Sequence, residues 1–150
     1  MAAAASTIKV RAATSRDAAS IGNLLSQLGY DVSAAEVARR VAVLEREDKH
    51  LLLVAADDGD KPLAVLHAFR RDALEKSPQV TVQSLVVDAS ARRLGTARLL
   101  MQATEDWAAA QGIVEVGLST RIDRTESHAF YESIGYRRAA TAHLYVKTCA

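Results

Sequence analysis

The apolar residues of this chain recur with two different periods, and the change of period marks the predicted helices and strands. Strands are predicted where β-branched and aliphatic residues form short runs, at residues 8–11, 50–56, 62–70, 81–87 and 113–118. Amphipathic helices are predicted where apolar residues recur at three- and four-residue spacing, at residues 14–28, 33–44, 94–108 and 127–134. This mixture of periods predicts a domain in which helices pack on a sheet.

The segments between these runs predict how the strands connect. Residues 57–60 read DDGD, a turn sequence between two apolar runs, which predicts a hairpin. The second, third and fourth strands are therefore predicted to form an antiparallel meander. A helical crossover makes the fifth strand parallel to the fourth, and two further short strands are predicted at residues 136–138 and 143–147.

Polar residues and glycines support the predicted helix ends. Thr14 is followed three residues later by Asp17, and Ser33 by Glu36, which is the spacing of a capping box. Gly29 is placed to end the first helix, since glycine is the residue that most readily closes a helix.

Composition and charge narrow the classes of function. The 150 residues suit a single domain, predicted to span residues 1–150 with residues 1–6 as a disordered tail. The 19 Lys and Arg against 18 Asp and Glu leave almost no net charge, so no nucleic-acid partner is predicted. The single cysteine, Cys149, excludes an internal disulfide, and no His or carboxylate spacing suggests a metal site. No signal peptide or membrane span is evident, so a cytoplasmic protein without a membrane partner is expected.

A basic turn between the fourth strand and the third helix is a candidate phosphate site. Residues 92–97 read RRLGTA. The first N–H groups of a helix have no intrahelical partner and lie at the positive end of its dipole. Gly95 and Ala97 leave the backbone uncovered, so a diphosphate would lie across the N–H groups of residues 93–98 among the nearby arginines. An ordinary strand-to-helix turn is the alternative, whereas a Rossmann site and a P-loop lack their glycine patterns here.

A second motif lies near the C-terminus and supports the interpretation of the first. Residues 118–120 read LST and residues 124–136 read RTESHAFYESIGY. Together with LVVD at residues 85–88 and the R-x-x-G-x-A turn, this motif resembles the two signatures of the GNAT N-acetyltransferase family, in the family's order. The resemblance covers roughly residues 8–147 and is similar to small-molecule members such as aminoalkylphosphonate N-acetyltransferases.

The resemblance implies a fold and a co-substrate. The implied fold is α/β (α+β mixed): a central mixed, mostly antiparallel sheet of six to seven strands, with about four helices on both faces. The co-substrate is acetyl-CoA, whose pantetheine would pair with the fourth strand where it splays from the fifth, with an N–H near Val87 polarising the carbonyl. A fully paired fourth strand is the alternative. The implied coenzyme-binding residues are Leu85, Val86, Val87, Arg92, Arg93, Leu94, Gly95, Thr96, Ala97, Arg98, Arg124 and Ser127.

The resemblance assigns Tyr131 as the general acid for the coenzyme thiolate. Phe130 and Ile134 are four residues apart and can face the core together, whereas Tyr131 is rotated by about 100° on the same helix. A phenol with a pKa near 10 keeps its proton at neutral pH. A tyrosine that only packs in the core is the alternative. Arg124 stands where an Asn is frequent and either binds a phosphate or is solvated, and His128 either contacts coenzyme or points outward.

The general base is where the sequence departs from the family pattern. Many relatives place a carboxylate at the position of Thr81 or Gln83, and neither side chain here can take a proton. Alternation puts residues 81, 83, 85 and 87 on one face, and a hairpin folded about residue 75 puts His67 opposite Gln83. His67 is therefore the candidate base. A hydrogen-bonded structural histidine and a relay through water are the alternatives.

The resemblance and these residues together imply an acetyl-CoA-dependent N-acetyltransferase that acts directly on a primary amine of a small molecule. The resemblance implies substrate contacts where the first two helices join, at Tyr30 and Asp31, with a surface turn as the alternative, and Gln83 is a further candidate contact. No cysteine or Ser-His-Asp order suggests an acyl-enzyme. The rivals are a catalytically silent acyl-CoA-binding or protein-interaction domain, and an acetyltransferase of protein lysines or N-termini. A homodimer is a candidate assembly.

Overall fold

The computed structural model describes residues 7–150, and the predicted tail of residues 1–6 lies outside this range. The chain divides into two compact units, residues 1–119 and residues 120–150. The helices and strands of the first unit are β1 (Lys9–Ala12), α1 (Ala18–Ser26), α2 (Ala34–Glu45), β2 (His50–Ala56), β3 (Pro62–Arg71), β4 (Gln79–Val87), α3 (Thr96–Ala110) and β5 (Val116–Leu118), with short 3₁₀ helices at Ser15–Asp17 and Ala89–Ala91.

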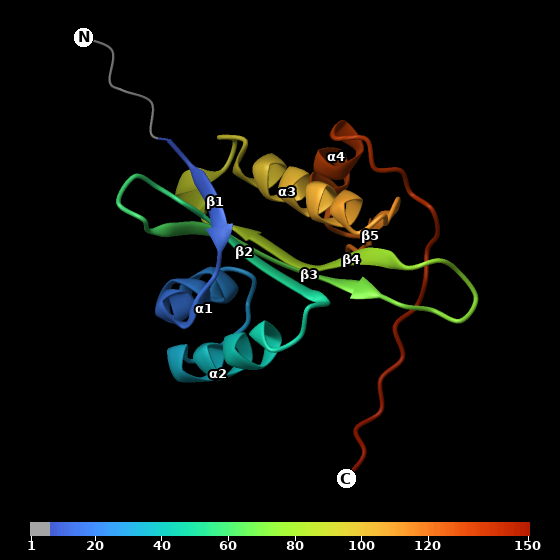
Figure 1. The fold of residues 1–150 in the computed structure, drawn as a ribbon, viewed down its shortest axis with the longest axis horizontal. Helices are drawn as coiled ribbons and strands as arrows, with labels where there is room; N and C mark the ends of the chain where they lie inside the picture. The colour runs from blue at the N-terminus through green and yellow to red at the C-terminus, as the bar shows by residue number, and fades with distance from the viewer. Residues whose placement is uncertain (1–6) are drawn as a thin grey trace. The chain divides into compact units, whose positions relative to one another are not determined.

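The strands of the first unit form one five-stranded sheet in the order β1-β2-β3-β4-β5 (Figure 1). The first four strands pair antiparallel, and β5 runs parallel to β4. The parallel pair follows from the crossover through α3, which returns the chain to the same end of the sheet. The predicted meander and crossover are therefore confirmed, although β5 is shorter than the predicted strand at residues 113–118.

The two faces of this sheet are covered by different helices. α1 and α2 lie on one face, and α3 lies on the other (Figure 1). On the first face, Val54, Val65 and Val86 belong to one buried cluster with Ile21 of α1 and Val37 of α2. Burying such side chains contributes about 1.5–3 kcal/mol each, and this is what holds the helix pair on the sheet.

The capping residues predicted for the early helices are confirmed by their hydrogen bonds, although Thr14 caps the 3₁₀ helix and α1 itself begins later than predicted, at Ala18. Ser33 Oγ accepts from the Glu36 N–H at 3.1 Å. Asp17 Oδ2 accepts from the Thr14 N–H at 2.8 Å. Each bond satisfies a backbone group that the helix leaves without a partner.

The third helix begins at Thr96, two residues later than predicted. Arg93 and Gly95 have left-handed backbone angles, with φ of 67° and 78°. A right-handed helix cannot contain such residues, so the turn extends to Gly95 before the helix starts.

A β-bulge changes the register between β3 and β4. His67 pairs with Ser84 and Ala68 pairs with Val82, so Gln83 is an extra residue on β4. The prediction that His67 lies opposite Gln83 is therefore wrong by one residue. The prediction that residues 81, 83, 85 and 87 share a face is also wrong, because a bulge shifts the alternation of the strand beyond it.

The second unit contains one helix, α4 (Thr125–Ser133). The strands predicted at residues 136–138 and 143–147 are absent from the described chain. A strand requires a neighbouring strand to pair with its backbone groups, and no described strand pairs with these residues. Over residues 7–150, the mixed α/β fold class and its four helices are confirmed, whereas the sheet has five strands rather than six or seven.

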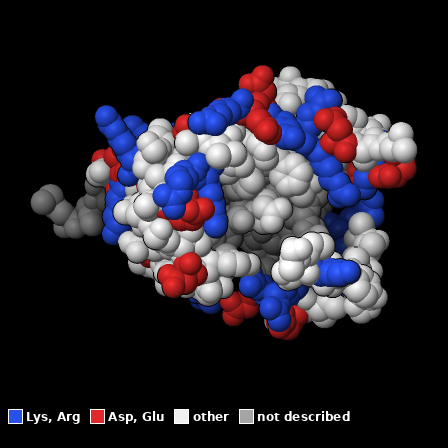
Figure 2. All heavy atoms as spheres, turned by 90° about the horizontal axis from the view of Figure 1, so that it is seen from below, with Lys and Arg blue, Asp and Glu red and all other residues white. Residues whose placement is uncertain are grey.

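Charged side chains of both signs are interspersed over the face of the first unit that carries α1 and α2 (Figure 2). This mixture agrees with the formal net charge of +1. Within residues 7–150, no helix has both the length and the apolar content needed to cross a bilayer.

Candidate active site

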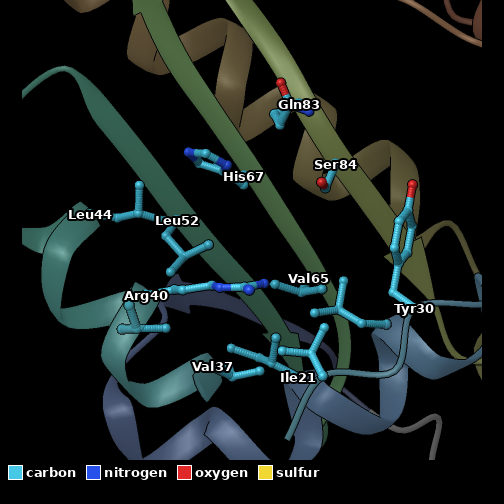
Figure 3. A pocket seen from close by; sticks show the side chains of 13 residues that line it. Ile21, Tyr30, Val37, Arg40, Leu44, Leu52, Val65, His67, Gln83 and Ser84 are labelled. Carbon is cyan, nitrogen blue, oxygen red and sulfur yellow. The ribbon is translucent and has the colours of Figure 1, made fainter. Parts of the chain in front are cut away.

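A pocket of about 320 Å³ lies between the sheet and the pair α1 and α2 (Figure 3). Its aliphatic lining consists of Ile21, Leu25, Val32, Val37, Val41, Leu44, Leu52 and Val65. Its polar lining consists of Tyr30, Arg40, His67, Gln83 and Ser84. A mostly apolar cavity with a few converging polar groups is suited to a small organic molecule.

His67 is the titratable group at the sheet side of this pocket. It projects from β3 between Leu52 on β2 and Gln83 on β4 (Figure 3). Burial, and to a lesser extent repulsion from His50, lower the pKa of His67 below its ordinary value of 6.5. At neutral pH the ring is therefore uncharged and has a lone pair with which to accept a proton.

The bulge on β4 brings two consecutive side chains to the same pocket. In a regular strand, Gln83 and Ser84 would point to opposite faces of the sheet. Here both line the cavity beside His67. The sequence predicted Gln83 as a substrate contact and did not identify Ser84.

The loop between α1 and α2 and the first turns of α2 form the opposite wall. Tyr30 lines the pocket and is 58% exposed. Asp31 is exposed and does not line the pocket, so the structure brings only the first of these two predicted contacts to the cavity. Arg40 extends from α2 across the pocket (Figure 3), and its Nε lies 3.2 Å from Glu36 Oε1.

One edge of β4 is open beyond its first residues. β5 pairs only with Val80, Thr81 and Val82. No other described strand pairs with that edge from Gln83 to Val87. The Asp88 N–H donates to the Leu63 carbonyl of β3 at 2.8 Å. Because consecutive N–H groups of a strand point to opposite edges, the Val87 N–H points to the open edge.

The turn that follows β4 presents backbone N–H groups without partners. Among the described residues, the N–H groups of residues 93–98 donate no backbone hydrogen bond. The left-handed residues Arg93 and Gly95 curve this segment, and such alternation of backbone conformation forms an anion-binding concavity. Arg92, Arg93 and Arg98 are exposed and form no salt bridge with a described residue.

The side chains of this turn leave its backbone accessible. Thr96 is buried, and its hydroxyl lies 3.4 Å from the Ala91 carbonyl oxygen, so the side chain is directed away from solvent. A Cβ built on Gly95 meets no atom within 4 Å. Space for a ligand against the backbone therefore exists at Gly95.

The second motif lies in the second unit, where Gly135 follows the end of α4. The Tyr136 N–H donates to the Tyr131 carbonyl at 3.0 Å, and Gly135 has a φ of 97°, the geometry of a glycine-terminated helix. The Tyr131 ring lies 5.1 Å from that of Phe130 and 6.0 Å from that of Tyr136. Partial burial raises the pKa of Tyr131 above 10, so the phenol keeps its proton at neutral pH.

The other residues of this motif differ in their surroundings. Arg124 is exposed at the start of α4, and Ser127 is half-buried. His128 Nε2 lies 2.8 Å from the Arg121 carbonyl oxygen, to which it donates. His128 is therefore engaged with its own loop.

Arg40, Ser84 and His50 were not identified from the sequence. Arg40 is three residues after Val37 and four before Leu44, so helical spacing could have placed it at the edge of the apolar face. Ser84 depends on the bulge, for which the sequence gives no signal. His50 Nδ1 lies 3.0 Å from His67 Nε2, and this pairing depends on the register of β2 and β3.

The model of the Acetyltransferase (GNAT) family matches residues 21–136. This range is more than half of the chain, and the chain belongs to that family. The resemblance inferred from the two motifs is confirmed, and the predicted enzyme class, an acetyl-CoA-dependent N-acyltransferase, is that of the family.

The chain is also similar to individual acetyltransferases. It is 29% identical over 97 residues to aminoglycoside N(6')-acetyltransferase type 1 of Acinetobacter genomosp. 13, a match that spans 62% of this chain and 66% of that enzyme, just under two thirds. The crystal structure of AAC(6')-Ih from Acinetobacter baumannii has a TM-score of 0.83 at 21% identity, covering 96% and 100% of the two chains. The structure of AAC(6')-Iy in complex with CoA has a TM-score of 0.86 at 21% identity, covering 99% and 100%. The structural similarities show a common fold.

Proposed function

We propose that this chain transfers the acetyl group of acetyl-CoA directly to a primary amine of a small molecule. One observation carries the proposal: the open edge of β4 leads into a turn of unpaired N–H groups, and the same strand borders a pocket containing His67. A strand edge, an anion site and a cavity are thus joined by one element.

The residues present fit a coenzyme with a diphosphate and an amide-containing arm. The N–H groups of residues 93–98 and the three nearby arginines would hold the diphosphate. The open edge of Leu85 to Val87 offers backbone groups to the amides of the arm. When bound, acetyl-CoA supplies an activated acetyl thioester.

Three groups of the chain are assigned to the reaction. His67 takes a proton from the acceptor ammonium, which frees the nitrogen lone pair for attack. The Val87 N–H would donate to the thioester oxygen as charge develops there. Tyr131, assigned through its motif, gives its proton to the departing thiolate. The C–N bond forms and the C–S bond breaks, and the second proton lost from nitrogen returns through water to the Tyr131 phenolate, so that only the proton on His67 remains to be released.

The lining of the pocket favours an acceptor with one amine and an apolar body. Within the described chain, the pocket is lined by no carboxylate, and its one charged side chain at neutral pH is the cation Arg40. A polycationic acceptor would leave ammonium groups unpaired against aliphatic side chains, which is costly. We therefore infer a small monoamine, although the relative from Acinetobacter genomosp. 13 is named for aminoglycosides.

A panel of amines tests the proposal against its rivals. Thiol release from acetyl-CoA would be measured with aliphatic and aromatic monoamines, an aminoglycoside and a lysine-containing peptide. We expect kcat/KM to be at least about tenfold higher for an apolar monoamine than for the other two classes, since several unpaired ammonium groups would each oppose binding. Tight binding of acetyl-CoA without release for any amine would support a silent binding domain. Release with the peptide alone would support a protein acetyltransferase.

A further inference from the structure

His67 is joined to a second histidine on the neighbouring strand. His67 lies opposite Leu52 and His50 lies opposite Phe69, so the two histidines are diagonal neighbours on one face of the sheet. Their rings are 5.2 Å apart, and His50 Nδ1 lies 3.0 Å from His67 Nε2. The Phe69 ring lies 5.9 Å from His50 and 6.2 Å from His67.

A carboxylate lies at the far end of this pair. His50 Nε2 is 3.4 Å from Glu47 Oε2, and the Glu47 side chain is 52% exposed. The same carboxylate oxygen lies 3.4 Å from Lys49 Nζ. The ring nitrogens thus form a continuous path from the pocket to a surface carboxylate.

The tautomers of the two rings decide where the protons sit in the neutral pair. The contact between two imidazole nitrogens holds one hydrogen. If His50 Nε2–H faces Glu47, then His50 Nδ1 carries a lone pair and accepts from His67 Nε2–H. His67 Nδ1, which hydrogen-bonds to no described residue, is then left with the lone pair that a base requires.

The other groups around His67 make a positive charge in the pocket costly. Burial disfavours an imidazolium at His67, and Arg40 of α2 lines the same cavity. The other polar groups of the lining are Tyr30 from the loop after α1 and the neutral Gln83 and Ser84 of β4. A charge at His50 would instead face Glu47.

We propose that His67, His50 and Glu47 form a relay that moves the charge of the acceptor's proton out of the pocket. An ammonium N–H bond breaks and its proton joins His67 Nδ1. The proton on His67 Nε2 passes to His50 Nδ1, which leaves His67 neutral and His50 an imidazolium beside Glu47. When product leaves, the bridging proton returns and the proton on His67 Nδ1 is lost to water, which restores the starting tautomers. His50 and Glu47 are positioning residues, and the relay rests on the proposed function.

The relay predicts a spectroscopic signature that needs no substrate. Nitrogen NMR of the free protein should show a proton on Nε2 of both rings at neutral pH, and a single proton uptake that places the charge on His50. Glu47→Gln removes the anion beside His50 and should weaken the preference of the charge for His50 over His67. Lys49→Met removes the other partner of Glu47 and should leave the order of protonation unchanged. Two rings that titrate independently, or a charge that stays on His67, would overturn the relay.

Kinetics test the same relay in the working enzyme. His50→Gln keeps an acceptor for His67 Nε2–H but cannot take its proton. It should lower kcat/KM by roughly tenfold to a hundredfold and shift the acid limb of the pH profile to lower pH, with melting temperature and acetyl-CoA affinity unchanged. A parental pH profile and rate in His50→Gln would contradict the relay. A parent that acetylates no amine contradicts the proposed function instead, and the NMR result then decides the relay separately.

Discussion

His67 on β3 is paired with Ser84 on β4, and the next pair along the two strands joins Ala68 to Val82. Gln83 lies between these pairs without a partner on β3. Beyond it, the N–H groups of β4 therefore point to the opposite edge from the one that regular alternation would give. Before the bulge, the Val80 N–H donates to the Glu115 carbonyl next to β5 at 3.0 Å. Beyond it, odd-numbered N–H groups face the open edge. One extra residue thus lets β4 bind β5 at one end and keep the Val87 N–H free at the other.

Coenzyme binding should depend on Gly95. Gly95→Glu places bulk and negative charge beside the N–H groups of residues 93–98, so acetyl-CoA binding should be lost. Isothermal titration calorimetry measures this directly. Gly112→Glu is the matched control, since Gly112 has a φ of 72° and equally open space at the other end of α3. Both variants carry the same backbone strain, of about 1 kcal/mol, so only binding should separate them. Equal affinity in the two variants would remove the turn from the coenzyme site.

The elements predicted best from sequence are those whose signals are local. The strand at residues 50–56 was predicted with its observed bounds, and Ser33 caps α2 as expected. Short apolar runs and capping side chains act over a few residues, so the sequence displays them. The turn between β4 and α3 was located for the same reason, whereas its role as a phosphate site stays a prediction.

The features that were missed depend on pairing between distant segments. The bulge at Gln83 and the contact of His50 with His67 depend on how neighbouring strands are aligned. The pattern of apolar residues within one strand does not reveal this alignment. The strands predicted at residues 136–138 and 143–147 had suitable residues but no described neighbour to pair with. Local propensity does not create a strand without a partner.

The buried Asp17 should be important for stability. Its two oxygens accept from Arg11 Nη1 and Nη2 at 2.9 and 2.8 Å, and the contact with Arg11 lowers the pKa of Asp17. Asp17→Asn should reduce the free energy of unfolding by about 2–4 kcal/mol, because it breaks a buried charged pair. Asp60→Asn removes the exposed partner of Arg11, and should cost less than about 1 kcal/mol. Urea unfolding of both variants gives the comparison. Similar losses in the free energy of unfolding would contradict the conclusion that the buried partner of Arg11 contributes more than the exposed one.

The histidine in the pocket should make the fold less stable in mild acid. Folding lowers the pKa of His67 below 6.5, so the unfolded state binds more protons between the lowered pKa and 6.5. The free energy of unfolding should therefore fall as pH decreases through this window. Urea unfolding would be measured at about pH 7 and about pH 5.5. Between these two values, the free energy of unfolding should decrease less in His67→Gln than in the parent. His143→Gln, at an exposed position, is the control and should keep the parental decrease. An equal decrease in all three proteins would mean that His67 does not titrate abnormally.

The role of Tyr131 is best tested by removing only its hydroxyl. Burial raises the pKa of this phenol, so it remains protonated at neutral pH and can donate a proton to a developing thiolate. Tyr131→Phe keeps the ring that contacts Phe130 and Tyr136, and stability and acetyl-CoA affinity should therefore change little. With the best amine, kcat should fall by roughly tenfold to a thousandfold. Tyr145→Phe, at a side chain that is 89% exposed, should leave kcat unchanged. A kcat for Tyr131→Phe within about twofold of the parent would assign the thiolate proton to water instead.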